Sequence, residues 1–495
     1  MLLWFVIIYW IISVAIGLVA ALRVHNSKDY TVAGRSLPMY IVTATVFATW
    51  FGSETVLGIP ATFLREGLGG VVADPFGSSM CLILVGLFFA RPLYRMNLVT
   101  IGDYYRRKYG RAVETLTTLC IVLSYLGWVA AQISALGLVF HVVSEGAMSQ
   151  TTGMIVGAST VLVYTVWGGM WSVAITDFLQ MIIIVLGMLY IGWDVSQLAG
   201  GVTVVVNHAI DAGKFSTFWP EPTLAGVLGF AAAAVTMMLG SIPQQDVFQR
   251  VSSSKNESIA GRASVLGGTL YFCFAFIPMF LAYSATLIDP QLVGALISGD
   301  RQSQLILPNM ILKHAPVFAQ VMFFGALLSA IKSCASATLL APSVSFTENI
   351  LRPAFKHMGD KQLLRLMRVV VVVFTALVTL FALNSHLSIY KMVESAYKVT
   401  LVSAFVPLVF GLYWKRANTQ GALAAIVLGL ATWIWLEVLA PHAACPPQLA
   451  GLFAALFGMI AGSLSPQWIR HPEGHRAHPI AGHAGPSVEH QRKAV

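Results

Sequence analysis

The sequence predicts an all-α polytopic membrane protein with about 13 transmembrane helices. Of its 495 residues, 57% are hydrophobic and only 10% are charged, whereas soluble proteins carry roughly 25% charged residues. Apolar runs of about 20 residues, the length that crosses the hydrocarbon of a bilayer, recur along most of the chain. These two observations exclude a soluble enzyme, a nucleic-acid-binding protein and a disulfide-stabilised secreted module.

The first apolar run is expected to be a retained helix and not a signal peptide. No basic residue precedes it, no small-residue cleavage site follows it, and its apolar stretch is too long. None of the loops between the later runs is long enough for a second folded domain. The expected spans are 2–22, 38–60, 70–92, 113–143, 152–167, 178–198, 223–245, 263–288, 317–341, 367–385, 389–412, 420–440 and 449–465.

Lys and Arg residues in the short loops predict the orientation in the membrane. With the N-terminus outside, the cytoplasmic segments hold 23 of the 30 basic residues, and the outer loops hold four: Arg65, Lys214, Arg301 and Lys313. Thirteen helices then put the C-terminus in the cytoplasm. The net charge of +9 is therefore a topology signal of a multi-pass protein in the plasma (inner) membrane. It does not indicate a nucleic-acid-binding surface.

Residues that break helices interrupt the second and seventh spans. The second reads ATWFGSETVLGIPATF, with Gly52, Pro60 and the acid Glu54; the seventh reads VTMMLGSIPQQDVFQR, with Gly240 and Pro243. Interrupted membrane helices are tolerated where the freed backbone groups are buried in protein or line a cavity. The two spans lie five helices apart, which indicates two five-helix repeats with a substrate site between them. The alternative is an accidental pairing, because Gly and Pro are common in membrane helices.

Several stretches resemble the signatures of the sodium:solute symporter family, which includes proline, pantothenate and monocarboxylate cotransporters. The two main ones are YTVWGGMWSVAITDFLQ (Tyr164–Gln180) and GLYWKRANTQGALAAIVLGLA (Gly411–Ala431), and AGRSLP, QDVFQR and SVSFTEN are also similar to family sequence. The resemblance implies a leucine-transporter type fold with a 5+5 inverted repeat, one extra helix before it and two after. It also implies alternating access driven by a cation gradient, with Na⁺ as the coupling ion.

The resemblance and the spans together predict five regions. The first helix and its cytoplasmic loop occupy 1–37, the two repeats occupy 38–198 and 199–412, two C-terminal helices occupy 413–465, and a disordered cytoplasmic tail occupies 466–495. The resemblance further implies a sodium site. Backbone carbonyls of Ala48 and Phe51 would bind the ion together with Ala330, Ser333 and Cys334 on the ninth span. Residues i, i+3 and i+4 share a helix face, but the thiol of Cys334 is a departure, because hard cations prefer oxygen ligands.

Ionisable residues at membrane depth are candidates for function. Lys332 lies between the expected sodium ligands but points roughly away from them, at about 100° per residue. We expect an acid partner for it, either Glu54 or Asp177, and the pair is either a structural bridge or a proton-responsive coupling element. Lys391, Glu394 and Lys398 share one helix face. They form either an intrahelical ion cluster near the outer mouth or a gate that attracts an anionic substrate.

The expected substrate site lies beside the broken helices. Ser124, Trp128 and Gln132 repeat every four residues in the fourth span, which makes them either a core stripe or the wall of a cavity, with Gln132 bonding the substrate. The other candidates flank the two helix breaks: Trp50, Phe51, Gly52, Glu54 and Gln244.

The sequence therefore predicts a secondary active transporter that imports a small organic solute by cation symport, and not an enzyme, because no catalytic triad, nucleotide-binding loop or metal motif is apparent. Basic groups at depth favour a carboxylate substrate. The alternatives are a proton-coupled or Na⁺-independent carrier of the same fold, or a membrane solute sensor. The sequence leaves the oligomeric state open.

Overall fold

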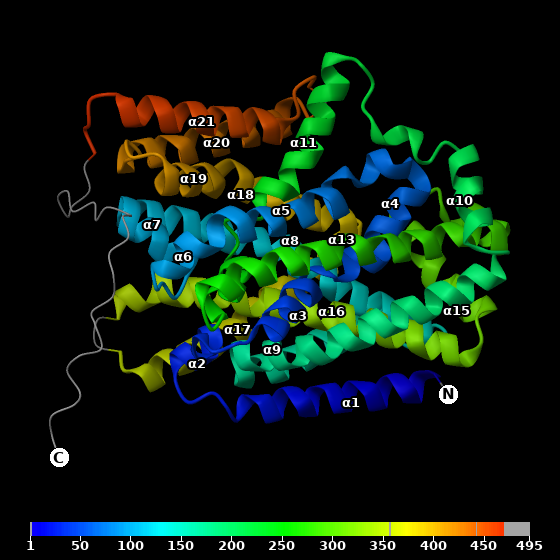
Figure 1. Cartoon of the computed structure of the whole chain (residues 1–495). Coiled ribbons are helices and arrows are strands. Elements are labelled where there is room, and N and C mark those ends of the chain that lie inside the picture. Colours follow the sequence, from blue (N-terminus) through cyan, green and yellow to red (C-terminus); the bar gives the residue numbers. More distant parts are fainter. Residues whose placement is uncertain (1, 356–357, 442, 470–495) are drawn as a thin grey trace.

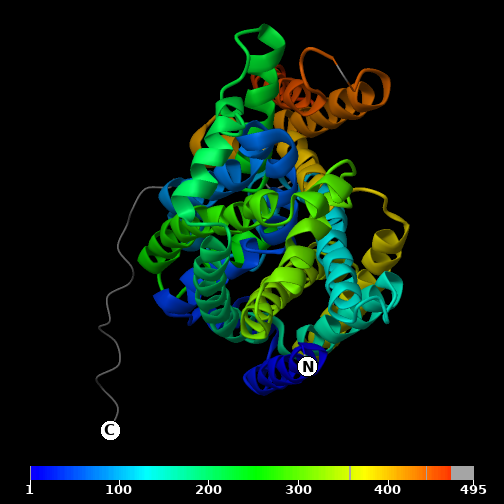
Figure 2. The same ribbon diagram turned by 90° about the vertical axis from the view of Figure 1, so that its right-hand side faces the viewer.

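The computed structural model describes residues 2–355, 358–441 and 443–469. Over these residues the chain is helical, and its one extended pairing is an isolated bridge between Leu37 and Ser254. Most of the long helices lie side by side along one direction, which α11 crosses steeply, with α1 on one side of the bundle and the α20–α21 pair on the opposite side (Figures 1 and 2). Of the tail predicted at 466–495, residues 470–495 lie outside the described part of the chain.

The α-helices follow one another with short connections. They are α1 (Leu2–Ala21), α2 (Ser27–Val32), α3 (Met39–Trp50), α4 (Ile59–Glu66), α5 (Ser78–Leu84), α6 (Ala90–Arg95), α7 (Ile101–Tyr109), α8 (Arg111–Val143), α9 (Gln150–Leu198), α10 (Val202–Asp211), α11 (Leu224–Gly240), α12 (Gln245–Ser253), α13 (Glu257–Ile288), α14 (Pro290–Leu296), α15 (Ile306–His314), α16 (Val317–Ser345), α17 (Asp360–Asn384), α18 (Ile389–Thr400), α19 (Val406–Tyr413), α20 (Thr419–Leu439) and α21 (Pro447–Leu464).

Short 3-10 and π segments join or extend these helices. They are η1 (Ala33–Arg35), η2 (Glu54–Gly58), η3 (Gly67–Val71), η4 (Val72–Gly77), η5 (Val85–Phe89), η6 (Ser216–Phe218), η7 (Ser303–Leu305), η8 (Phe346–Leu351), η9 (Arg352–Ala354) and η10 (Leu401–Phe405).

Ten helical segments of the described residues are long and apolar enough to cross a membrane, or eleven if the bent pair α11–α12 forms one span. This count is lower than the predicted 13 for three reasons: α9 holds two predicted spans, α11–α12 is the bent pair, and the break in the second predicted span leaves α3 with 12 residues. Helix α9 has 49 residues, about 74 Å at 1.5 Å per residue, more than twice the hydrocarbon thickness of about 30 Å. Gly169 (φ 49°, ψ −141°) interrupts it between the spans predicted at 152–167 and 178–198.

Both predicted helix breaks are confirmed. Helix α3 ends at Trp50, and Phe51 (φ −82°, ψ 73°) leaves the helical conformation before the chain resumes as η2 and α4. Helix α11 ends at Gly240, and α12 starts at Gln245 after a bend of 44°. Pro243 lies in this second gap, where its missing N–H costs no helical hydrogen bond.

Helix α16 is the central element of the bundle. It packs against α1, α3, α8, α9 and α12, and from Phe323 to Ser345 each of its residues is buried. The short helices α2 and α7, which carry basic residues, lie at one end of the bundle, and α10 and α15 lie at the other (Figure 1). The two breaks thus lie in the middle of the bundle, next to α16 and α8.

Candidate substrate and cation sites

Three aromatic side chains from three helices meet beside the first helix break. Trp50 ends α3, Trp128 lies on α8 and Tyr397 lies on α18, and all three are buried. The Trp128 ring centroid lies 5.7 Å from that of Trp50 and 5.5 Å from that of Tyr397, and the Trp50 and Tyr397 rings are 6.1 Å apart and nearly parallel. We call these three side chains the aromatic box.

The carboxylate of Glu54 lies against this box. It accepts hydrogen bonds from Nε1 of Trp128 (3.3 Å) and from Nε2 of Gln132 (2.7 Å), and its side chain is buried. Gln132 also accepts a hydrogen bond from the backbone N–H of Ser53 (3.0 Å), so the amide fixes the unwound segment of the chain. No basic side chain of the described residues lies within 4 Å of the Glu54 carboxylate. The site therefore places a buried carboxyl group beside aromatic faces.

The second break contributes Gln244 to the same region. Its amide donates to the Ser124 hydroxyl (3.0 Å) on α8 and to Thr400 Oγ1 (3.4 Å) on α18. Ser124 lies one turn before Trp128 on α8, so Gln244 contacts the part of α8 that adjoins the box. The structure thus brings together the residues predicted around the substrate: Trp50, Gly52, Glu54, Trp128, Gln132 and Gln244.

The expected cation site lies where the end of α3 packs against α16. The N–H of Gly52 donates to the carbonyl of Trp50 (3.0 Å), so it does not bond the Ala48 carbonyl that an uninterrupted helix would assign to it. On α16, Ala330, Ser333 and Cys334 are fully buried. A Cβ built on Gly52 would lie 2.9 Å from the Cys334 sulfur, which shows how closely the break packs on this face of α16.

A buried carboxylate on α9 holds one of these α16 residues. Asp177 accepts a hydrogen bond from the Ser333 hydroxyl (2.6 Å) and another from the Thr45 hydroxyl on α3. Because Ser333 donates its hydroxyl proton to Asp177, the oxygen lone pairs of Ser333 remain available to a cation. Asp177 therefore links the two helices that carry the expected ligands.

The predicted acid partner of Lys332 is wrong. No carboxylate of the described residues lies within 4 Å of its ammonium group, which has no hydrogen-bond partner there either. The Nζ atom instead lies 4.4 Å from the Trp10 ring centroid, 5.6 Å from that of Tyr9 and 5.7 Å from that of Tyr164. Lys332 points away from the Ser333 face of α16, as its position predicts, and aromatic faces of α1 and α9 attract the ammonium.

The predicted intrahelical cluster of Lys391, Glu394 and Lys398 does not form. Lys391 bonds Asp300 at 2.5 Å, and Lys398 lies 3.8 Å from Glu437 on α20. Glu394 has no ion pair among the described residues. Carboxylates on neighbouring elements approach the two lysines more closely than Glu394 does, so the charges are divided between α18, α20 and the loop that holds Asp300.

Sequence reasoning missed several buried polar contacts around the box. Tyr125 donates to Asp246 Oδ1 at 2.5 Å, Arg250 donates to Thr49 at 2.8 Å, and Tyr271 donates to Asp74 at 2.5 Å. Tyr397 of the box was also not predicted, although it lies three residues after Glu394 on the helix with the predicted charged face. Spacing along one helix cannot reveal such contacts, because each joins two distant segments.

Two helices broken at membrane depth and a buried site between them define a secondary transporter with the leucine-transporter type fold. The family profile of the sodium:solute symporter family matches residues 30–429. The chain belongs to the sodium:solute symporter family, and it is a multi-pass membrane transporter that imports a small organic solute by symport with Na⁺.

Known proteins similar to this chain are transporters and not enzymes. The high affinity choline transporter 1 of Homo sapiens is 29% identical over 446 residues, covering 86% of this chain and 75% of that protein. The sodium/pantothenate symporter of Escherichia coli (strain K12) is 25% identical over 455 residues, covering 89% and 92%. Among solved structures, a Na⁺-coupled sialic acid symporter in a substrate-bound outward-open state superposes with a TM-score of 0.79 at 20% identity, covering 93% and 96%.

Proposed function

We propose that this symporter imports a small organic cation, of the quaternary ammonium class, and that the aromatic box with Glu54 binds it. The observation that carries this proposal is the Glu54 carboxylate, buried against Trp128 and unpaired with any basic side chain of the described residues. Tryptophan and tyrosine faces attract cations within about 6 Å of the ring centroid. A buried carboxylate supplies the full charge that balances the substrate.

The similarity to choline transporters supports this substrate class, because choline is a quaternary ammonium ion. The similarity to sodium/pantothenate symporters supports the carboxylate substrate that the sequence predicted. That prediction depended on the basic groups at depth, which are Lys332, Lys391 and Lys398. The Lys332 ammonium lies at the aromatic rings of α1 and α9 and not at the box, and the two lysines of α18 lie near Asp300 and Glu437. A carboxylate in the box would meet Glu54 without a basic partner, so we favour the cation.

Sodium would bind between the first break and α16. We propose that the carbonyls of Ala48, Phe51 and Ala330 and the hydroxyl of Ser333 hold it. Asp177 does not bind the ion itself but accepts the hydrogen bond from the Ser333 hydroxyl. Phe51, Gly52 and Glu54 belong to the same short stretch between α3 and η2. An ion bound to the Phe51 carbonyl would therefore also fix the position of Glu54 beside the box. Binding of both cargoes shifts the equilibrium toward the closed state by the difference in affinity between the states.

The membrane arrangement of this proposal has the N-terminus outside and the C-terminus in the cytoplasm of the plasma membrane. The 23 basic residues of the predicted cytoplasmic segments against four outside support it. The two repeats at 38–198 and 199–412 would move relative to each other around the breaks, with 1–37 and 413–465 as peripheral helices.

Transport in proteoliposomes tests the substrate and the coupling ion together. The purified protein is reconstituted, and uptake of choline, pantothenate and proline is measured with an inward gradient of Na⁺ or of K⁺. We expect Na⁺-dependent choline uptake that a protonophore leaves intact. Pantothenate uptake without choline uptake would overturn the substrate class, and uptake that ignores Na⁺ but stops with a protonophore would overturn sodium coupling in favour of a proton-coupled carrier.

Replacing Cys334 with serine should strengthen sodium binding. A hydroxyl is a better ligand for a hard cation than a thiol, so we expect the Na⁺ concentration for half-maximal uptake to fall about fivefold, or about 1 kcal/mol. The matched control is Cys120→Ser, which changes a buried thiol on α8 and should leave the Na⁺ dependence unchanged. Equal Na⁺ curves for wild type and Cys334→Ser would argue against a ligand at this position.

Adding a methyl group at Gly52 should disable the site. The new Cβ would lie 2.8 Å from Glu54 Oε2 and 2.9 Å from the Cys334 sulfur, and overpacking of this kind costs about 1–3 kcal/mol. We expect Gly52→Ala to lower choline uptake at least about tenfold. Gly229→Ala on α11, where a Cβ meets no atom within 4 Å, is the control and should transport normally. Similar uptake by the two variants would contradict this account of the break.

A further inference from the structure

The polar groups around the aromatic box follow one another along α8 in steps of one helical turn. Gln132 holds the Glu54 carboxylate (2.7 Å) one turn to one side of Trp128. Ser124, one turn to the other side of Trp128, receives a hydrogen bond from Gln244 (3.0 Å). The box is therefore bounded along α8 by the first helix break on one side and by the second helix break on the other.

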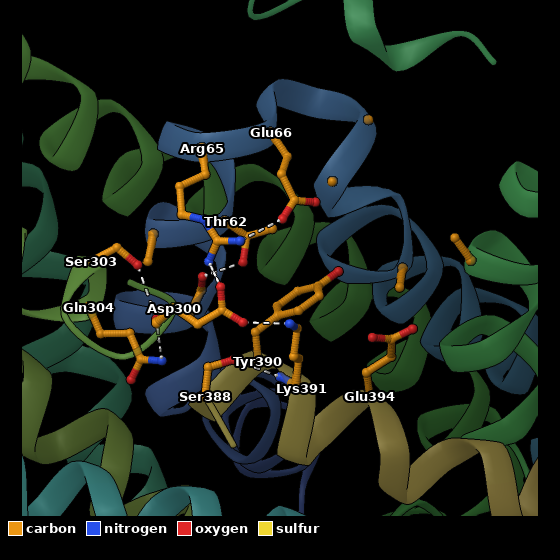
Figure 3. Close-up of a pocket in the computed structure, with 16 residues that line it drawn as sticks. Thr62, Arg65, Glu66, Asp300, Ser303, Gln304, Ser388, Tyr390, Lys391 and Glu394 are labelled. Atoms are coloured by element: carbon orange, nitrogen blue, oxygen red, sulfur yellow. Dashed lines mark hydrogen bonds and ion pairs between the residues drawn. The ribbon is translucent and has the colours of Figure 1, made fainter. Parts of the chain in front are cut away.

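Helix α18 gives the same order. Tyr397 belongs to the box, and Thr400, in the next turn, receives the other hydrogen bond of the second break (3.4 Å). Glu394, in the turn before Tyr397, lines a cavity of about 230 Å³ together with Gly58 of η2 (Figure 3). The cavity of Figure 3 thus adjoins the box on the side of the first break, and the second break lies on the opposite side.

The second break places a buried carboxyl group beside the box, in the first turn of α12. Asp246 is fully buried, and its Oδ1 atom accepts a hydrogen bond from the Tyr125 hydroxyl (2.5 Å). The backbone N–H of Asp246 donates to the same hydroxyl oxygen (2.9 Å). The Tyr125 ring stacks on Trp128, with 5.9 Å between the ring centroids and 17° between the ring planes. One aromatic ring therefore separates the Asp246 carboxyl group from a wall of the box.

The other carboxyl oxygen of Asp246, Oδ2, has no hydrogen-bond partner among the described residues. Arg250 lies one turn later in α12, but its guanidinium donates to the backbone carbonyl of Asp246 (3.0 Å) and to the Thr49 hydroxyl (2.8 Å). No basic side chain in the described part of the chain lies within 4 Å of the Asp246 carboxyl group. A buried acceptor without a donor is costly, and a donor group on the bound substrate would remove that cost.

We propose that Asp246 determines which group the substrate carries at the end away from its ammonium. The free oxygen of Asp246 accepts the proton of a hydroxyl group, while Glu54 balances the quaternary ammonium in the box. This inference rests on the proposed function, because it assumes a quaternary ammonium substrate. Tyr125 lies three residues, about 4.5 Å, before Trp128 on α8, and a two-carbon linker with one hydrogen bond spans this distance.

The same carboxyl group excludes a zwitterionic substrate. Glycine betaine has the trimethylammonium group of choline but carries a carboxylate in place of the hydroxymethyl group. That carboxylate would meet Asp246 without a basic side chain between them, and like charges repel strongly where water is excluded. Specificity of this kind comes from a repulsive contact with the wrong ligand as much as from a bond to the right one. The site therefore selects a quaternary ammonium alcohol over a betaine.

Isothermal titration of the purified full-length protein in saturating NaCl tests the proposal with choline, the O-methyl ether of choline and glycine betaine. The ether keeps the charge and the oxygen of choline but has no proton to donate, so the long-range attraction is the same for both. In wild type we expect choline to bind at least about tenfold more tightly than the ether, because a hydrogen bond to a charged group contributes this much. Betaine should bind at least about 100-fold more weakly than choline.

Replacing Asp246 with asparagine should remove both preferences. The amide oxygen can still accept from Tyr125, which leaves an NH₂ donor in place of the free acceptor. We expect choline and the ether to bind within about twofold of each other, and betaine to gain at least about tenfold relative to choline. The matched control is Asp74→Asn, because Asp74 is a buried carboxyl group that also accepts from a tyrosine, Tyr271 (2.5 Å). Asp74→Asn should keep the wild-type ratios.

The failure of this inference is distinguishable from the failure of the proposed function. If wild type binds none of the three ligands, the quaternary ammonium class fails and the role of Asp246 fails with it. If wild type binds the ether or betaine as tightly as choline, the class stands and the role of Asp246 is overturned, whether or not the variant folds. If Asp246→Asn unfolds at the wild-type temperature and keeps the wild-type ratios, a different acceptor binds the hydroxyl, and the proposal is again overturned.

Discussion

Replacing Glu54 with glutamine should weaken choline binding about 100-fold, which is about 2.7 kcal/mol. Two unit charges 4 Å apart attract each other by about 4 kcal/mol at an effective dielectric constant of 20, and the cost of removing both charges from water offsets part of this attraction. Glutamine keeps the size of the side chain and an oxygen that can accept from Trp128 or Gln132. Isothermal titration of the purified protein with choline in saturating NaCl measures the change.

A neutral isostere of choline separates the charge from the shape. In 3,3-dimethylbutan-1-ol a carbon replaces the ammonium nitrogen, so the molecule has nearly the same volume and no charge. We expect Glu54→Gln to change its affinity less than threefold. If both ligands lose affinity equally, Glu54 holds the shape of the site and does not recognise a positive charge, and the proposed substrate class loses its main support.

Replacing Asp177 with asparagine should raise the Na⁺ concentration for half-maximal uptake about tenfold, or about 1.4 kcal/mol. Asparagine can still accept from Ser333 and Thr45 through its amide oxygen, so the helices remain linked while the negative charge behind the cation site is lost. Initial rates of choline uptake at varied Na⁺ measure the effect, and saturating Na⁺ should restore most of the maximal rate.

The control for Asp177→Asn is Thr45→Val, which removes one hydrogen bond to the same carboxylate and keeps its charge. We expect a smaller rise in the half-maximal Na⁺ concentration, about threefold. The opposite result for Asp177→Asn is a lower maximal rate that Na⁺ cannot restore, with an unchanged half-maximal Na⁺ concentration. It would show that Asp177 stabilises the packing of the helices and does not affect ion binding.

Much of the fold could be predicted from the sequence, because a membrane imposes a simple rule on it. Each span needs about 20 apolar residues, and a break at depth needs residues such as Gly52, Gly240 and Pro243 that leave the helix. The stripe of Ser124, Trp128 and Gln132 on the fourth span also followed from periodicity alone. These are properties of one helix at a time, and for this reason the amino-acid sequence determined the helical class, the two breaks and most of the residues beside them.

Only the tertiary structure decided which side chains meet across helices. The sequence offered Glu54 and Asp177 as partners of Lys332, but α1 supplies Trp10 and Tyr9 to that lysine and leaves both acids to other contacts. Lys391 likewise bonds Asp300, 91 residues away, and not Glu394 on its own helix. The physical reason is that a buried charge takes the partner that packing brings within a few ångströms, and spacing along one helix does not contain that distance.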